Sequence, residues 1–433
     1  MVLQSCDSYL DVKPRSNLVV PETLDDMEQL LDYGSLFNAY PELLELQADD
    51  FYFKSDYWNS MSNLVNKNAY VWAEDIYGTT ESHQAWSDQY IKIFYANAVL
   101  DGLDKMERKA SNSARYDQIK GSALFLKAEA VYLLAQLFAK VYDIRTAHTD
   151  LGIPIPMSAD VNEKLTRPSN QFTFDFITNS LLEAEKLLLP VADFSRPSKP
   201  AANALLARVY LYMGDYKRAK ENVSMSLSRF NEVINLNEAT KRNFKQTLIC
   251  RFISPTNDFY NNIRINTIID TNLMKSYHKS DLRKVYYLEK KAEFHYVKNN
   301  SHDLGLLPFA GLDTDEQYLI RAECYARDGE IDLALSDLNH LLENRFANGT
   351  YSPYAGLDSD MVLHRVLEER RKELVFRGLR WSDLKRLNRE GENIALQRIL
   401  GDQVFTLPPN HPKWVFPIPL NEINISKLIQ NER

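Results

Sequence analysis

The chain has 433 residues, of which 45% are hydrophobic and 25% are charged, as in an ordinary globular protein with a large core. Its formal net charge is −8 and no basic stripe is present, which argues against a nucleic-acid partner. Gly is scarce (14 residues), which argues against phosphate-cradling loops, and no run of about 18 apolar residues predicts a membrane span.

The first residues contain a candidate lipid-attachment signal. Leu3-Gln4-Ser5-Cys6 matches the short pattern at which bacterial lipoproteins are cleaved and acylated on the new N-terminal cysteine. Only five residues precede Cys6, so the charged and apolar regions of a signal peptide are missing, and a chance match is the alternative. A lipid on Cys6 would anchor the protein to a membrane surface without making it span the membrane.

Apolar residues recur at helical spacing over most of the chain, which predicts a mostly α fold. The pattern predicts helices over 22–33, 84–107, 113–142, 172–188, 200–230, 315–344 and 361–387. The intervening segments are polar or contain proline and are expected to be irregular: 38–80, 143–171, 189–199, 231–314 and 388–420. The longest of them, 231–314, has some β-like alternation but predicts no definite strand.

Two stretches of the chain share a spacing pattern. The first contains Ala207, Tyr210, Gly214, Tyr216 and Ala219, and the second has Ala322, Tyr325, Gly329, Ile331 and Ala334 at the same intervals. The pattern resembles the tetratricopeptide helical hairpin, in which alanine allows close approach of the helices and glycine forms the turn. Two unrelated helical hairpins are the alternative. Their separation in the sequence argues against one contiguous array.

Motifs of catalysis and of metal or cofactor binding are missing. The eight histidines form no HExxH motif, and CxxC, GxSxG, GxGxxG and GxxxxGK[ST] are absent, so no metal, cofactor or nucleophile is predicted. Asp49-Asp50 and Glu74-Asp75 are paired carboxylates, but neighbours in sequence do not establish the spatial separation that a glycosidase needs. We interpret them as loop or helix-cap carboxylates.

Aromatic residues are concentrated in 51–77, where they alternate with asparagines. Sugar rings have apolar C–H faces and a rim of hydroxyls, so a site for them combines flat rings with amides. The segment therefore predicts sugar platforms at Tyr57, Trp58, Trp72 and Tyr77, with Asn59 and Asn63 as polar partners. Tyr260 and Asn261, in the long irregular segment, are weaker candidates. The alternative is that about half of the rings are core anchors.

Residues 367–387 are dense in charge. Glu369 lies one helical turn before Glu373, with Arg370 able to reach Glu373, and Gly378 interrupts the pattern before Arg380-Trp381. Charges at this density usually satisfy one another, so we predict a salt-bridged corner that joins two helices rather than catalytic acids.

The same segment resembles the hallmark of the SusD/RagB family of outer-membrane nutrient-binding lipoproteins. The resembling residues are Glu369-Arg370-Arg371-Lys372-Glu373, Phe376, Gly378, Arg380-Trp381 and Asp383-Leu384. Further resemblances follow in family order at Trp86, Tyr90 and Asn97, at Tyr277, Asp281 and Arg283, at Tyr318 to Glu323, and at Phe416 to Pro419 with Gln430-Asn431. Arg377 departs from the acidic residue that is common in the family, and the final Gly-Tyr is missing.

The resemblance implies one SusD-like unit over 1–433. It implies a tetratricopeptide-like scaffold in 84–230 and 315–387, a loop-rich ligand-facing region in 38–80 and 231–314, and a C-terminal segment in 388–433. It further implies a lipid-anchored protein, exposed on the outer membrane, that binds oligosaccharides (in some members peptides) without catalysis. Such a protein passes its ligand to a SusC-like TonB-dependent transporter. An extracytoplasmic glycosidase and a protein-interaction scaffold remain the alternatives.

Overall fold

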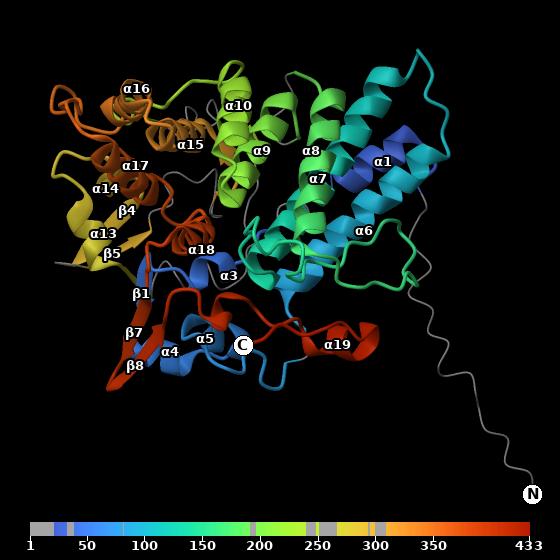
Figure 1. Cartoon of the computed structure of the whole chain (residues 1–433), viewed down its shortest axis with the longest axis horizontal. Coiled ribbons are helices and arrows are strands. Elements are labelled where there is room, and N and C mark those ends of the chain that lie inside the picture. The colour runs from blue at the N-terminus through green and yellow to red at the C-terminus, as the bar shows by residue number, and fades with distance from the viewer. Residues whose placement is uncertain are drawn as a thin grey trace, which may run out of the picture.

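The computed structural model describes residues 21–32, 39–80, 82–190, 196–239, 248–250, 266–292, 295–298 and 309–433. Long paired helices form a row along one side of the molecule, and short helices and two-stranded hairpins form the other side (Figure 1). The prediction of a mostly α fold built on tetratricopeptide-like hairpins is confirmed.

The N-terminal half of the row contains helices that pack against their neighbours in the chain. They are α1 (Leu24–Leu31), α6 (Gln84–Asp104), α7 (Ser113–Phe138), α8 (Asn170–Leu187), α9 (Lys199–Met213) and α10 (Tyr216–Leu227). The predicted helix over 200–230 is divided at Gly214, which adopts the left-handed conformation (φ +83°) that ends α9. Asp215 then caps α10 by accepting a hydrogen bond from the Arg218 N–H.

The row continues with α15 (Thr314–Arg327), α16 (Ile331–Glu343) and α17 (Ser359–Glu373), whereas α18 (Arg380–Glu390) lies beside the row and packs against α3 (Leu43–Leu46) and α9 (Figure 1). Helix α15 packs directly against α10, so the two hairpins that share a sequence pattern are neighbours in space (Figure 1). The hairpins are not contiguous in sequence, as expected, and it is the contact of α10 with α15 that joins them. Gly329, at φ +77°, occupies the turn that corresponds to Gly214.

Helix α7 is the central core helix. By length and composition it is the one helix among the described residues that could cross a membrane, although we predicted no such segment. Within the protein, 94% of its most apolar stretch is buried, as in the core helix of a globular protein.

The irregular side holds short helices: α3 (Leu43–Leu46), α4 (Ser55–Ser60), α5 (Leu64–Tyr70), α13 (Thr271–Ser276), α14 (Arg283–Tyr286), the 3-10 helix η3 (Pro412–Trp414) and α19 (Leu420–Ser426). Its strands pair antiparallel as β1 (Phe51–Phe53) with β3 (Thr267–Ile269), β2 (Leu248–Cys250) with β6 (Leu312–Asp313), β4 (Leu288–Ala292) with β5 (His295–Lys298), and β7 (Leu396–Leu400) with β8 (Gln403–Leu407). Segment 38–80 therefore has more regular structure than we expected.

The β7–β8 hairpin lies in 388–420, which we expected to be irregular. Leu396 pairs with Leu407, and the register runs to Leu400 opposite Gln403. Arg398 takes a buried position on β7, with its guanidinium 4.6 Å from the ring centre of Tyr70 and 4.8 Å from that of Trp72. Because the charged Arg398 is buried and the apolar Ile399 is exposed, the sequence of β7 lacks the alternation of apolar and polar residues that usually marks a strand.

Buried ion pairs join α17 and α18 to the rest of the molecule, as we predicted for 367–387. Arg283, fully buried, contacts Asp281 (2.6 Å), Glu369 (2.6 Å) and Glu373 (3.1 Å). The expected contact between Arg370 and Glu373 is not formed. Arg370 pairs with Asp383 on α18 at 2.8 Å, which closes the corner between the two helices.

Candidate functional site

Two of the four predicted sugar platforms belong to the core. Trp72 is 2% exposed, its indole N–H donates to the Gln47 carbonyl (3.3 Å), and Arg398 covers its ring. Tyr77 is equally buried and donates its hydroxyl to the Pro417 carbonyl (2.7 Å). The prediction that these rings face a ligand is wrong, because residues from the C-terminal end of the chain cover them.

The other two predicted platforms, Tyr57 and Trp58, lie on α4 and are half-buried. The indole N–H of Trp58 donates to the Lys67 carbonyl (3.0 Å), and the Lys67 ammonium lies 5.0 Å from the ring centre. The ring of Tyr57 packs on Phe53 with the centres 5.0 Å apart. Each residue is thus packed partly against the core and remains partly exposed.

Both predicted polar partners are exposed, but one has a structural task. Asn63 caps α5 by accepting a hydrogen bond from the Asn66 N–H (3.0 Å). Asn59 accepts a hydrogen bond from Lys67 through its backbone carbonyl (2.9 Å) and points its side chain to solvent. Tyr260, Asn261 and Cys6 lie outside the described residues.

We call the surface formed by Tyr52, Tyr57, Trp58 and Asn59 the aromatic edge. Tyr52 is 36% exposed because it is the outward residue of β1, between the buried Phe51 and Phe53. Helix α4 is fixed to the β7–β8 hairpin, since the Gly401 N–H donates to the Ser55 hydroxyl (2.9 Å) (Figure 1). The edge is therefore held on packed elements.

The paired carboxylates beside the aromatic edge are bound by arginines. Asp49 contacts Arg380 (2.7 Å), and Asp50 contacts Arg371 (3.0 Å). Burial opposes ionisation of Asp49, but the two arginines outweigh it and lower its pKa. Burial raises the pKa of Asp50 to about 6, with the neighbouring Asp49 adding to the rise. The pair attaches the N-terminal segment to α17 and α18.

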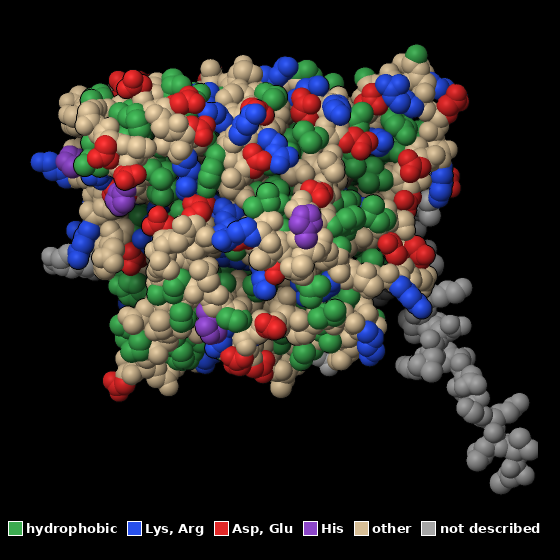
Figure 2. Space-filling model, viewed as in Figure 1, with side chains coloured by type: hydrophobic (Ala, Val, Ile, Leu, Met, Phe, Trp, Pro, Cys, Tyr) green, Lys and Arg blue, Asp and Glu red, His purple; other side chains and the backbone are tan. Residues whose placement is uncertain are grey.

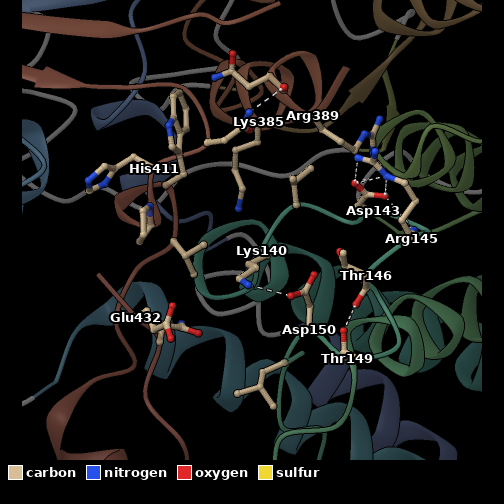
Figure 3. Close-up of a pocket in the computed structure, with 18 of the residues that line it drawn as sticks. Lys140, Asp143, Arg145, Thr146, Thr149, Asp150, Lys385, Arg389, His411 and Glu432 are labelled. Atoms are coloured by element: carbon tan, nitrogen blue, oxygen red, sulfur yellow. Dashed lines mark hydrogen bonds and ion pairs between the residues drawn. The ribbon is translucent and has the colours of Figure 1, made fainter. Parts of the chain in front are cut away.

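A cavity of about 590 Å³ lies apart from the aromatic edge, where the loop after α7, helix α18, the η3 region and the end of the chain meet (Figure 3). On the face shown in Figure 2, Lys and Arg side chains gather near the middle, where the surface is hollowed. The charged and titratable side chains that line the cavity are Lys140, Asp143, Arg145, Asp150, Lys385, Arg389, His411 and Glu432. Sequence reasoning did not find this cavity, because its walls come from four distant segments.

Lys385 is the most buried charged side chain of the cavity. It is 3% exposed, and its ammonium donates to the carbonyls of Gln136 (2.8 Å) and Ala139 (2.9 Å) at the end of α7. Its ammonium points into the cavity (Figure 3). Burial lowers the pKa of Lys385 to about 7. A sequence signal existed: Lys385 follows the core residue Trp381 by one helical turn, on the buried face of the helix.

Comparison with protein families decides the family of the chain. The model described as "SusD family" matches residues 210–432, more than half of the chain, and the model described as "Starch-binding associating with outer membrane" matches residues 8–211. The chain belongs to the SusD family. The resemblance noted in the charged segment is thereby confirmed.

Individual relatives of this SusD family member are distant. SusD-like protein P38 of Formosa agariphila is 26% identical over 235 residues, which span 50% of this chain and 41% of that protein. The chain thus matches less than half the length of this curated relative.

Solved structures resemble the chain over nearly its whole length. A putative sugar binding protein from Bacteroides vulgatus has a TM-score of 0.79 at 20% identity, covering 95% of this chain and 99% of its own. A SusD superfamily protein from Bacteroides thetaiotaomicron has a TM-score of 0.78 at 20% identity, covering 95% and 100%. At these identities the likeness establishes the fold.

Arg377, where this SusD family member departs from the family pattern, is accommodated within the core. Its guanidinium is 2% exposed and contacts Asp315 on α15 at 2.7 Å. The acidic partner is therefore supplied by another helix, and the departure has a structural role.

Proposed function

We propose that this protein captures oligosaccharides at the outer face of the outer membrane and passes them to a SusC-like TonB-dependent transporter, without catalysis. The observation that carries the proposal is the aromatic edge, where the partly exposed Tyr57 and Trp58 lie beside the exposed Asn59. Rings next to amides suit the C–H faces and hydroxyls of a sugar. The edge lies on β1 and α4, and α4 is fixed to the β7–β8 hairpin. In this SusD family chain, segments 38–80 and 231–314 would face the ligand, and segments 84–230 and 315–387 would support them.

Ligand contacts are assigned to Tyr57, Trp58, Asn59 and Asn63, together with Tyr260 and Asn261. The side-chain N–H groups of Asn63 are available to a hydroxyl, because its capping contact uses only the amide oxygen. Trp72 and Tyr77 are left out of this set because they are buried.

The alternative of a glycosidase finds little support in the carboxylates near the aromatic edge. A glycosidase needs two carboxyl groups that act on opposite sides of the scissile bond. Asp49 and Asp50 are held by Arg380 and Arg371. Glu74 contacts Lys413 (3.1 Å), and Asp75 accepts a hydrogen bond from the Gly78 N–H (2.9 Å). Each of these carboxylates has a structural partner.

The test is affinity electrophoresis of the purified protein through gels that contain soluble starch or other neutral polysaccharides. We expect retardation by at least one glycan without any hydrolysis product. Tyr57→Ala and Trp58→Ala should each weaken retention about tenfold, as expected for a ring at the centre of a contact. Tyr95→Ala removes a half-buried ring on α6, far from α4 in Figure 1, and is the matched control.

The outcomes separate the three functions. Released sugar would establish a glycosidase and overturn the proposal. Absence of retardation by every glycan, with saturable binding of a peptide pool, would assign a peptide-binding SusD-like protein or an interaction scaffold. Equal retention of Tyr57→Ala, Trp58→Ala and the wild type would remove the aromatic edge as the site.

Membrane attachment is tested separately at Cys6. In cells that express the full-length gene and are fed labelled fatty acid, we expect the wild-type protein to be labelled. The Cys6→Ala variant should remain unlabelled, because acylation requires the thiol. The variant should leave the membrane fraction and no longer cross-link to a TonB-dependent barrel. Continued membrane binding of Cys6→Ala would contradict the anchor.

A further inference from the structure

The cavity between α7, α18 and the end of the chain contains a cation, Lys385, that forms no ion pair with a carboxylate of the described residues. Lys140 pairs with Asp150 (3.0 Å), Arg145 pairs with Asp143, and Arg389 pairs with Glu390 (2.8 Å). Among the contacts of the described residues, Lys385 donates only to two backbone carbonyls. Glu432, the remaining carboxylate that lines the cavity, forms no ion pair with Lys385. Lys385 is thus the one cation of the cavity lining, within the described residues, that has no ion-pair partner.

Two other buried lysines of the protein are paired with carboxylates. Lys92 and Lys372 are each almost fully buried and pair with Glu129 (3.2 Å) and Glu369 (2.7 Å). Lys127 likewise forms no ion pair with a described residue, but its ammonium lies 5.1 Å from the ring centre of Phe176, and Lys127 does not line the cavity. A buried ammonium without a counter-ion is costly, which favours binding of an anion beside it.

The two carbonyl contacts of Lys385 have a structural explanation that leaves room for a ligand. Gln136 and Ala139 lie at the C-terminal end of α7, where backbone carbonyls lack helical partners and attract cations. Two of the three ammonium N–H groups are used there. The third remains, and the ammonium points into a cavity whose volume lies within the range of small-molecule sites (Figure 3).

Uncharged groups of the cavity suit a ligand with hydroxyls. Nδ1 of His411 accepts a hydrogen bond from the Lys413 N–H (3.2 Å), so in the neutral imidazole Nε2 carries the proton and can donate. The hydroxyl of Thr146 and the amide of Asn410 line the same cavity. Donors and acceptors of this kind bind sugar hydroxyls in water-accessible pockets.

We propose that the cavity is a second sugar site, specific for a uronic acid, with Lys385 donating a hydrogen bond to the sugar carboxylate. This rests on the proposed function for the preference for sugars, but its residues are distinct from the aromatic edge. An acidic oligosaccharide would place one uronic acid residue in the cavity, where its carboxylate would be the counter-ion that Lys385 lacks.

The first experiment compares three probes by isothermal titration calorimetry on the unaltered protein at pH 6. Glucuronate should bind at least tenfold more tightly than glucose, because only glucuronate pairs with Lys385, and more tightly than acetate, because acetate has no hydroxyls. Equal binding of glucose and glucuronate would overturn the role of the carboxylate. Acetate binding as tight as that of glucuronate would overturn the assignment to a sugar.

The second experiment changes the lysine. Lys385→Met keeps a long side chain but removes the charge, and we expect glucuronate affinity to fall at least tenfold. Lys127→Met, a buried lysine outside the cavity, should bind glucuronate within about twofold of the wild type. Both variants need thermal unfolding curves, because the loss of contacts to α7 destabilises Lys385→Met. Unchanged glucuronate affinity in a folded Lys385→Met protein would overturn the proposal.

A pH series keeps the proposal testable even if Lys385→Met does not fold. With a pKa of about 7, Lys385 is charged at pH 6 and almost neutral at pH 9, so glucuronate affinity should fall about 100-fold over this interval. The other groups that face the cavity are Lys140, Asp143, Arg145, Asp150, Arg389, His411 and Glu432. His411→Gln should keep the decline, which separates it from Lys385. An affinity that does not change between pH 6 and pH 9 would contradict the assignment.

Failure at the cavity is distinguishable from failure of the proposed function. Neutral glycans would still be retarded through the aromatic edge in Lys385→Met. Loss of glucuronate binding in Trp58→Ala, with Lys385→Met unaffected, would assign glucuronate to the aromatic edge and end the proposal of a second site.

Discussion

At the scale of single residues, cationic side chains take positions that a sequence pattern assigns to apolar ones. Arg398 covers the rings of Tyr70 and Trp72, and Lys385 occupies the core-facing side of α18. Guanidinium and ammonium groups lie favourably over aromatic faces or at helix C-termini, so burial does not require that they be apolar. Sequence alone could not assign Trp72 to the core, because Arg398, which covers it, is supplied by a distant segment.

Trp381 is among the largest fully buried side chains of the described residues, so its removal should cost much stability. It is completely buried and stacks on Trp414 with ring centres 4.5 Å apart. Trp381→Ala should lower the free energy of unfolding by roughly 3–5 kcal/mol, because it leaves a large cavity in the core. Urea denaturation measures this, with Ile425→Ala, a 77% exposed position, as the control. A loss below about 1 kcal/mol would contradict a core role for Trp381.

At the scale of elements, the helices were predictable and the short strands were not. Every predicted helical range overlaps one or two observed helices, because the amphipathic period extends over many residues. The β7–β8 hairpin has only five residues in each strand, and Arg398 and Ile399 reverse the expected inside and outside positions. Strands β1 and β3 are shorter still, and their partners, such as Phe51 and Ile269, are far apart in the sequence.

The turn between α17 and α18 depends on Gly378. It has φ +71°, and a Cβ atom there would lie 2.4 Å from Cε1 of Tyr40. Its N–H donates to the Glu45 carboxylate (2.9 Å). Gly378→Ala should therefore combine backbone strain with a steric clash and destabilise the fold by more than about 2 kcal/mol.

Gly329 is the matched control for this substitution. It has nearly the same backbone conformation, φ +77°, but open space around the position of a Cβ atom. Gly329→Ala should cost only about 1 kcal/mol from backbone strain. Thermal and urea unfolding of both variants separate the two causes. Equal losses would indicate that contact with Tyr40 contributes nothing.

At the scale of the whole molecule, buried ion pairs make stability depend on acid. Glu316, Glu323, Glu369 and Asp383 are all buried, and burial alone would raise their pKa values. Neighbouring arginines outweigh burial and hold the pKa of each below its ordinary value. The unfolded chain therefore takes up protons first as pH falls, so the stability supplied by these groups is present above their unfolded pKa values and is lost on acidification.

We expect the urea midpoint of unfolding to fall steeply as pH decreases below about 4.5, the unfolded value for glutamate. Glu369→Gln removes one of these titrating groups and should make the decline shallower. Glu107→Gln, whose side chain is 78% exposed, should leave it unchanged. A midpoint that is constant between pH 3 and pH 6 would mean that the buried ion pairs contribute nothing to the pH dependence.

The family and the general arrangement of the molecule were predictable because the charged corner at 367–387 has a distinctive pattern of residues. The cavity was not, because Lys140, Lys385, His411 and Glu432 come together only after the chain end returns to α7. That return is visible in the hydrogen bond from the Phe416 N–H to the Leu137 carbonyl (2.8 Å). Contacts between such distant segments leave no periodic trace in a single sequence.

The covering of Trp72 by Arg398 has a consequence for the order of events during biosynthesis. A growing polypeptide that has not yet reached position 398 has its early aromatic segment made but without its lid, so those rings stay available to chaperones or to other nascent chains. The packing around Trp72 is therefore completed only after residue 398 has been synthesised, while helices such as α7 and α8 can already form local contacts.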